Sequence, residues 1–96
     1  MKISEVTIQD LKEYAREYND DPVTNRTFET ILTAVKSYIQ GYTGLSVEQM
    51  DTKEDLVIAM KVLSNEMYDN RTFTVENDKV NTVIKSILDM HSVNLL

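Results

Sequence analysis

The chain has 96 residues, no cysteine and one histidine, and its 10 Lys and Arg against 16 Asp and Glu give a formal net charge of −6. This length predicts one domain, residues 1–96. Without cysteine there is no disulfide, thiolate nucleophile or Cys-ligated zinc, and one histidine leaves no partner for a triad, so we expect no enzyme, metal or cofactor. An acidic chain is poorly suited to grip DNA phosphates. No apolar run reaches the ~18 residues of a membrane span, and residues 1–5 lack a signal-peptide core, so we expect a soluble intracellular protein.

The first helix is expected over residues 8–18. Thr7 precedes it and Asp10 follows three residues later, which is the spacing of a capping box. The break comes before Pro22, because proline disfavours helical geometry in the preceding residue. One side of this helix is apolar and carries Ile8, Leu11, Tyr14, Ala15 and Tyr18.

The second helix is expected over residues 23–42, followed by a linker at residues 45–51. Gly44 suits a left-handed cap at the end of this helix. Gly41 lies inside the helix, where the missing side chain allows another backbone to approach closely. The apolar stripe of this helix is the clearest in the chain and consists of Phe28, Ile31, Leu32, Val35, Tyr38, Ile39 and Tyr42.

The third helix is expected over residues 52–69, with Thr52 and Asp55 at the spacing of a capping box. Ile58 and Val62 point to a different side from the main stripe. A helix that is apolar on several sides is either central in its fold or covered by a partner. The main stripe consists of Leu56, Ala59, Met60, Leu63 and Met67.

The fourth helix is expected over residues 79–91, after a connection at residues 70–78. Four helices with one stripe each predict an all-α fold, either a small bundle or an orthogonal array of about four helices. The tail at residues 92–96 is apolar where chain ends are usually polar, which favours a protein contact. The apolar side of the fourth helix carries Val80, Val83, Ile84, Ile87, Leu88 and Met90.

His91 lies in line with this apolar side. A general base or a pH switch is one interpretation of such a histidine. The sequence places no acid or nucleophile to work with it, so we interpret His91 as a structural or interface residue. The five tyrosines lie at helical spacings, mostly on apolar faces, and are interpreted as packing residues.

Asp51, Glu54 and Asp55 cluster near the start of the third helix. A calcium loop needs an oxygen ligand at its third position and glycine at its sixth, but these positions hold Lys53 and Leu56. Acids in the first turn of a helix interact favourably with its dipole. We therefore interpret the cluster as helix-start chemistry.

Three stretches together resemble the phage head-tail connector family, also described as DNA-packaging adaptor proteins of long-tailed phages and prophages. The first joins residues 11–14 to the acidic turn at residues 20–21. The second is residues 34–44, similar to a family helix that ends in tyrosine, threonine and glycine. The third runs over residues 55–71 and is similar to a family helix that ends in tyrosine, any residue, asparagine and arginine. The matching positions in the second and third stretches are Tyr38, Tyr42, Gly44, Tyr68, Asn70 and Arg71.

The resemblance implies a structural virion protein located at the head-tail interface, and in the host cytoplasm during assembly. Its subunits form a homo-oligomeric ring, twelve-fold in the virion, although a member can be monomeric alone. The ring lies beneath the portal protein, extends the DNA channel and supports tail-completion or tail proteins. Genomic DNA passes through it without sequence-specific binding.

Under this interpretation, the candidate subunit interface consists of Ile58, Val62 and Gly41. The candidate docking segment for the portal or a neighbouring subunit consists of Val93, Leu95 and Leu96. Two alternatives remain open, a small helical DNA-binding regulator and an adaptor that binds a host protein. The acidic third helix argues against the regulator, because a recognition helix is usually basic.

Overall fold

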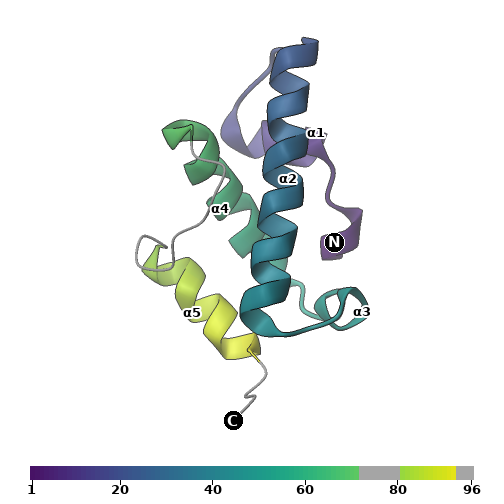
Figure 1. Ribbon diagram of the computed structural model, residues 1–96, viewed down its shortest axis with the longest axis vertical. Coiled ribbons are helices and arrows are strands. Elements are labelled where there is room, and N and C mark those ends of the chain that lie inside the picture. The colour runs from purple at the N-terminus through teal and green to yellow at the C-terminus, as the bar shows by residue number, and fades with distance from the viewer. Residues whose placement is uncertain (72–80, 93–96) are drawn as a thin grey trace.

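The computed structural model describes residues 1–71 and 81–92, and in these residues the fold is all-α, as predicted (Figure 1). The tail at residues 93–96, including Val93, Leu95 and Leu96, lies outside the described residues, as do residues 72–80. A short 3-10 helix and five α-helices follow in chain order: η1 Ile3–Glu5, α1 Ile8–Ala15, α2 Pro22–Thr43, α3 Val47–Met50, α4 Asp55–Asn70 and α5 Thr82–His91.

The long helix α2 is the axis around which the other helices are arranged (Figure 1). Helices α1, α4 and α5 all pack against it, and α4 also contacts α1, α5 and η1. Helices α4 and α5 lie on one side of α2, and α3 lies on the other side (Figure 1). The two longest helices therefore form the centre of the fold, and the shorter ones close its edges.

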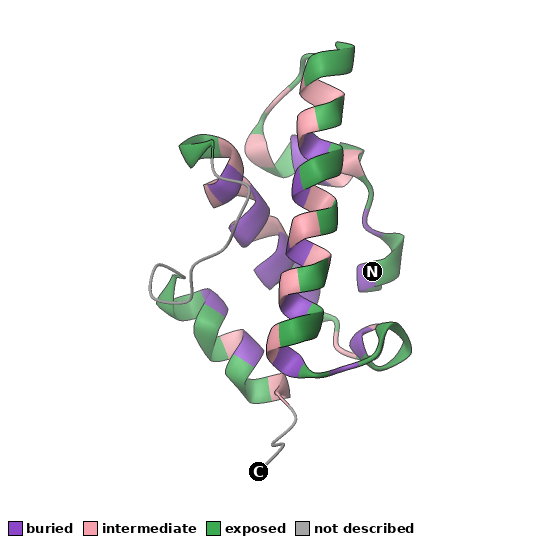
Figure 2. Ribbon diagram, in the orientation of Figure 1, coloured by how far each residue is buried: buried purple, intermediate pink, exposed green. Residues whose placement is uncertain are grey.

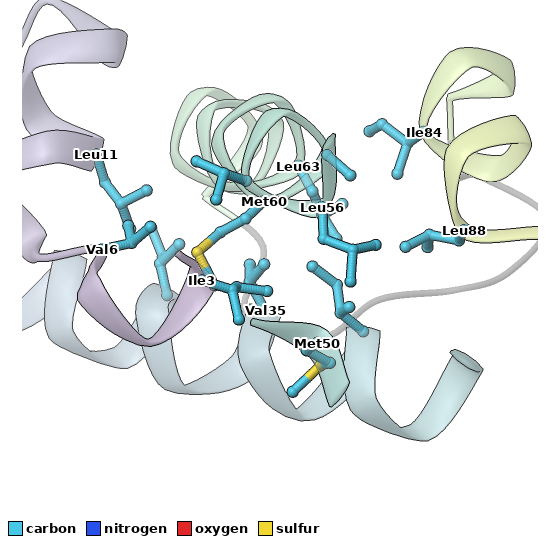
Figure 3. Packing of buried hydrophobic residues seen from close by; sticks show 14 of the residues in the cluster. Ile3, Val6, Leu11, Val35, Met50, Leu56, Met60, Leu63, Ile84 and Leu88 are labelled. Atoms are coloured by element: carbon cyan, nitrogen blue, oxygen red, sulfur yellow. The ribbon is translucent and has the colours of Figure 1, made fainter. Parts of the chain in front are cut away.

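The core lies between α2 and α4, as Figures 2 and 3 show. All residues of the predicted main stripe of α4 are buried, and the predicted α2 stripe is buried or half-buried. The sequence prediction of both stripes is confirmed. Helix α4 also buries Val57, and the rest of the chain completes the core with Ile3, Val6, Leu11, Leu45, Met50, Ile84 and Leu88.

Helix α1 is shorter than the sequence predicts. The capping box at its start is confirmed, since the backbone N–H of Asp10 donates to the Thr7 hydroxyl and the Asp10 carboxylate accepts from the Thr7 N–H. The helix ends at Ala15, because Arg16 adopts a left-handed backbone with φ 57°. Tyr14 and Tyr18 are exposed, so their expected place on a buried side is wrong.

The predicted linker at residues 45–51 contains helix α3. Ser46 caps this helix, and the Gln49 side chain accepts from the Ser46 backbone N–H, which completes a capping box. The expected capping box of Thr52 with Asp55 is wrong. The Thr52 hydroxyl instead donates to the Gln49 carbonyl at 2.7 Å. The Thr52 side chain therefore caps the C-terminal end of α3 and not the start of α4. Helix α4 starts at Asp55 without a side-chain cap.

Helix α5 begins at Thr82, later than predicted, and Asn81 caps it by accepting from the Val83 N–H at 2.8 Å. Its buried side is narrow and consists of Ile84 and Leu88. Val83 and Met90 were expected on the same apolar side, but both are exposed. The reason is that α5 lies at the edge of the fold, where α2 and α4 cover only part of its apolar surface.

Candidate protein-interaction surface

Helices α4 and α5 lie side by side and run antiparallel, and a hydrogen bond links them near each end. His91 Nε2 lies 2.7 Å from the Asp55 carboxylate oxygens, at the end of α5 and the start of α4. The Asn81 amide donates to the Glu66 carboxylate at 3.3 Å, at the opposite ends of the two helices. His91 was predicted to be a structural or interface residue. The structure gives it a partner, Asp55, which the sequence does not reveal.

Val62 lies on the side of α4 that faces α5. It follows Asp55 by seven residues and precedes Glu66 by four, so all three point in nearly the same direction. Ile58 lies one turn before Val62, on the outer edge of the same side. The two residues predicted for a subunit interface therefore lie on one continuous strip of α4.

The facing side of α5 continues this apolar surface. Val83, Ile87 and Met90 recur at i, i+4 and i+7, and Ile87 lies one turn before His91, which contacts α4. We call the combined surface the α4–α5 strip. It consists of Ile58, Val62, Val83, Ile87 and Met90.

The α4–α5 strip is largely uncovered. Ile58 is 56% exposed, Val83 is 63% exposed and Met90 is 69% exposed, while Val62 and Ile87 are half-buried against the core. Apolar surface gains about 25 cal/mol for each Å² removed from water, and clustered exposed apolar side chains mark contact sites. This strip is the best candidate for an interaction surface in the described part of the chain.

Gly41 lies outside the α4–α5 strip, on an exposed part of α2. A Cβ at this position would meet no atom within 4 Å. Among the described residues of one copy, no neighbouring backbone occupies the space that a side chain at Gly41 would fill. The structure thus brings Ile58 and Val62 together and leaves the third predicted interface residue separate.

The first group of family-motif residues closes the C-terminal end of α2. Gly44 caps the helix with φ 73°, as predicted. The Tyr42 hydroxyl donates to the Asp89 carboxylate, which joins α2 to α5, and this bond raises the Tyr42 pKa to about 12. The Tyr38 ring lies against the Tyr42 ring, with a centroid separation of 5.8 Å. These residues have a structural role in the end of the helix.

The second group closes the C-terminal end of α4. The Tyr68 ring packs on Phe28, with centroids 4.5 Å apart, and its hydroxyl donates to the Glu17 carboxylate at 2.7 Å. Arg71 adopts a left-handed backbone after Asn70, the last residue of α4, and its guanidinium lies 4.2 Å from the Tyr68 ring centroid. Tyr68 is therefore a packing residue that links α4 to α2 and to the segment after α1.

Lys12 is a buried cation, which was not predicted from the sequence. The residue is 2% exposed, and its ammonium donates to the Asn25 side-chain oxygen at 2.8 Å and lies 3.8 Å from Asp20. Buried ammonium groups need such partners, because transfer from water without compensation is costly. Asp20 in the acidic turn before α2 and Asn25 in the first turn of α2 supply them. A lysine on the apolar side of a predicted helix was the available signal, since Ile8 and Leu11 flank the same side.

The described residues hold no group of three or more His, Cys, Asp or Glu side chains arranged to bind a metal ion. No described helix combines the length and apolar character needed to span a membrane. In the residues that the structure describes, fold and surface together define a small all-α protein with an exposed apolar strip on α4 and α5. Comparison with family models, with curated proteins and with solved structures finds no match for this chain.

Proposed function

We propose that this protein is a structural subunit of a phage head-tail connector, without enzymatic activity. Copies of it assemble into a ring beneath the portal protein, twelve-fold in the virion, which extends the DNA channel and supports the tail. The observation that carries this proposal is the exposed α4–α5 strip on a domain of 96 residues. A surface of this kind is expected of a subunit that gains stability from neighbours.

The charge of the chain also supports the proposal. A net charge of −6 without a basic stretch disfavours a tight grip on DNA phosphates. A channel through which DNA slides benefits from the same property, because like charges repel. In a DNA-binding regulator, α4 would be the recognition helix and would need to be basic. It carries three acidic residues, Asp55, Glu66 and Asp69, and one basic residue, Lys61.

The test is assembly with the portal protein encoded in the same genome. Purified portal rings are mixed with this protein, and complexes are separated by sedimentation and viewed by negative-stain electron microscopy. We expect an added ring of density on one end of the portal. The variant Ile58→Asp should lose this density, because it places a charge within the apolar strip.

The matched control is Glu13→Lys, which changes an exposed residue of α1 away from the strip. It should assemble like the parent protein. A parent protein that leaves the portal bare would contradict the proposal. A salt-sensitive gel shift with duplex DNA at low protein concentration would instead favour the DNA-binding regulator.

A further inference from the structure

A concave surface lies between α2, α3 and η1. Helix α3 and η1 lie on the other side of α2 from α4 and α5 (Figure 1). The concave surface has a cavity of about 250 Å³, and its apolar walls include Ile3, Val47 and Met50. Lys36, Ser37 and Gln40 of α2 form its polar side. We call it the α2–α3 groove.

Two hydrogen bonds join η1 and α3, which form two of the walls of the α2–α3 groove. The Asp51 carboxylate accepts from the Ser4 backbone N–H at 2.9 Å and from the Ser4 hydroxyl at 2.7 Å, which fixes η1 to the end of α3. Val47, at the mouth of the groove, is 49% exposed. A cavity of about 150 Å³ accommodates benzene, so this groove has room for aliphatic side chains.

One charged residue beside each surface allows an ion pair between two copies, Lys36 at the groove and Glu54 near the strip. Lys36 lines the groove, where its ammonium interacts electrostatically with the Asp51 carboxylate, and it makes no hydrogen bond among the residues that the structure describes. On α4, Glu54 lies one turn before Ile58 and its side chain makes no capping bond. Asp69 lies at the other end of α4 and is exposed. A carboxylate at one surface can thus meet an ammonium at the other while apolar side chains are buried between them.

We infer that the α2–α3 groove receives the α4–α5 strip of a second copy of this chain, with Glu54 of one copy facing Lys36 of the other. This inference rests on the proposed function, because it specifies how neighbouring subunits meet. The contact is heterologous, joining two different surfaces that face away from each other. Such a contact repeats from copy to copy and closes into a ring when the rotation permits.

Cysteine cross-linking tests the contact, since the parent chain has no cysteine. Two single variants, Val47→Cys in the groove and Met90→Cys on the strip, are oxidised alone and as an equal mixture at high concentration. The heterologous contact predicts a disulfide-linked dimer in the mixture and little in either variant alone. A tag on one variant identifies which two chains are joined. Glu13→Cys, mixed with each variant in turn, measures random collision.

Two results would overturn the inference. One is a dimer of Met90→Cys with itself that exceeds the mixed product, because that pattern requires a symmetric strip-to-strip contact. The other is mixed product no more abundant than with Glu13→Cys. Either result can occur while the parent protein still adds a ring to the portal, in which case the proposed function stands and this inference fails.

Charge reversal tests the same contact without cysteine. Glu54→Lys and Lys36→Glu should each weaken self-association by about fivefold, measured by sedimentation equilibrium, and the double variant should recover most of the loss. Glu13→Lys has the same change of charge as Glu54→Lys and should leave self-association unchanged. Loss in the double variant equal to the sum of the two single losses would contradict the pairing of these residues.

Discussion

Tyr68 illustrates how a single side chain joins three parts of this molecule. Its ring lies on Phe28 of α2, and its hydroxyl bonds the Glu17 carboxylate in the segment after α1. The bond from Tyr68 is the main reason why the Glu17 pKa lies below its ordinary value of 4.5. The same bond raises the Tyr68 pKa above 10.0. Because of these two pKa shifts, the contact between Tyr68 and Glu17 stabilises the fold over a limited pH range.

The variant Tyr68→Phe should lower the melting temperature, and the loss should depend on pH. A carboxyl whose pKa is lowered by folding stabilises the protein above its unfolded pKa and loses this effect as pH falls through the folded value. A phenol whose pKa is raised by folding loses its effect as pH rises above 10. The difference in melting temperature between parent and variant should therefore be largest between about pH 5 and pH 9 and narrow on either side.

Tyr14→Phe is the control for this series, because Tyr14 is exposed and no described residue bonds its hydroxyl. Its melting temperature should follow the parent at every pH. A Tyr68→Phe difference that stays constant down to pH 3 would show that the hydroxyl does not act through the Glu17 carboxylate.

In helix α2 and its cap, the two glycines of the chain differ in whether their backbone conformation requires glycine. Gly44 caps α2 in a left-handed conformation, which side chains with a Cβ adopt at a cost. Gly41 lies three residues earlier in ordinary helical geometry, with open space around the position of a Cβ. The same substitution at these two positions should therefore change stability in opposite directions.

Gly44→Ala should lower the free energy of unfolding by about 1–2 kcal/mol. Gly41→Ala should raise it by about 0.5–1 kcal/mol, because alanine favours a helix interior and loses less backbone entropy. Urea denaturation of both variants beside the parent measures the two effects. If both variants are destabilised alike, the assignment of Gly44 as the left-handed cap is wrong.

The helix interiors were predictable from sequence, and several helix ends were not. The α2 and α4 stripes follow from periodicity, because burial against another helix needs apolar residues on one side. The end of α1 was missed because Arg16, and not glycine, adopts the left-handed conformation there. Helix α3 was missed although Ser46 and Gln49 have capping-box spacing, since four residues are too few to show a stripe.

For the whole molecule, the sequence located the apolar residues but not which of them stay uncovered. Val83 and Met90 share a helix side with Ile87, and their exposure depends on how far α4 and α2 reach over α5. The α2–α3 groove depends on η1 folding back against α3 through Ser4 and Asp51. Both features depend on tertiary contacts between distant parts of the chain.

The contrast between core and strip predicts a large difference between two truncations on α4. Leu63 is buried where α4 faces the core, so Leu63→Ala should cost about 2–5 kcal/mol of unfolding free energy. Ile58→Ala removes a side chain that is already in water and should change the stability of the isolated protein by less than about 0.5 kcal/mol. Chemical denaturation at low protein concentration measures both.

If Leu63→Ala has the same denaturation curve as the parent protein, the assignment of Leu63 to the core is wrong. A large loss for Ile58→Ala in dilute protein would show that Ile58 contributes to the fold of one copy. That outcome would remove the α4–α5 strip as a free surface.

The first turn of α2 stands apart from the core, because Phe28 is the first buried residue of a helix that begins at Pro22. Asp21 caps this turn and Asn25 holds the Lys12 ammonium of α1. Local opening costs least free energy where few apolar contacts are lost, so we expect backbone amides in this turn to exchange with solvent sooner than those at Ile31 or Val35. Opening the turn also removes the Asn25 partner of Lys12. We therefore expect opening of this turn to weaken the link between α2 and α1, while Leu11 still holds α1 in the core.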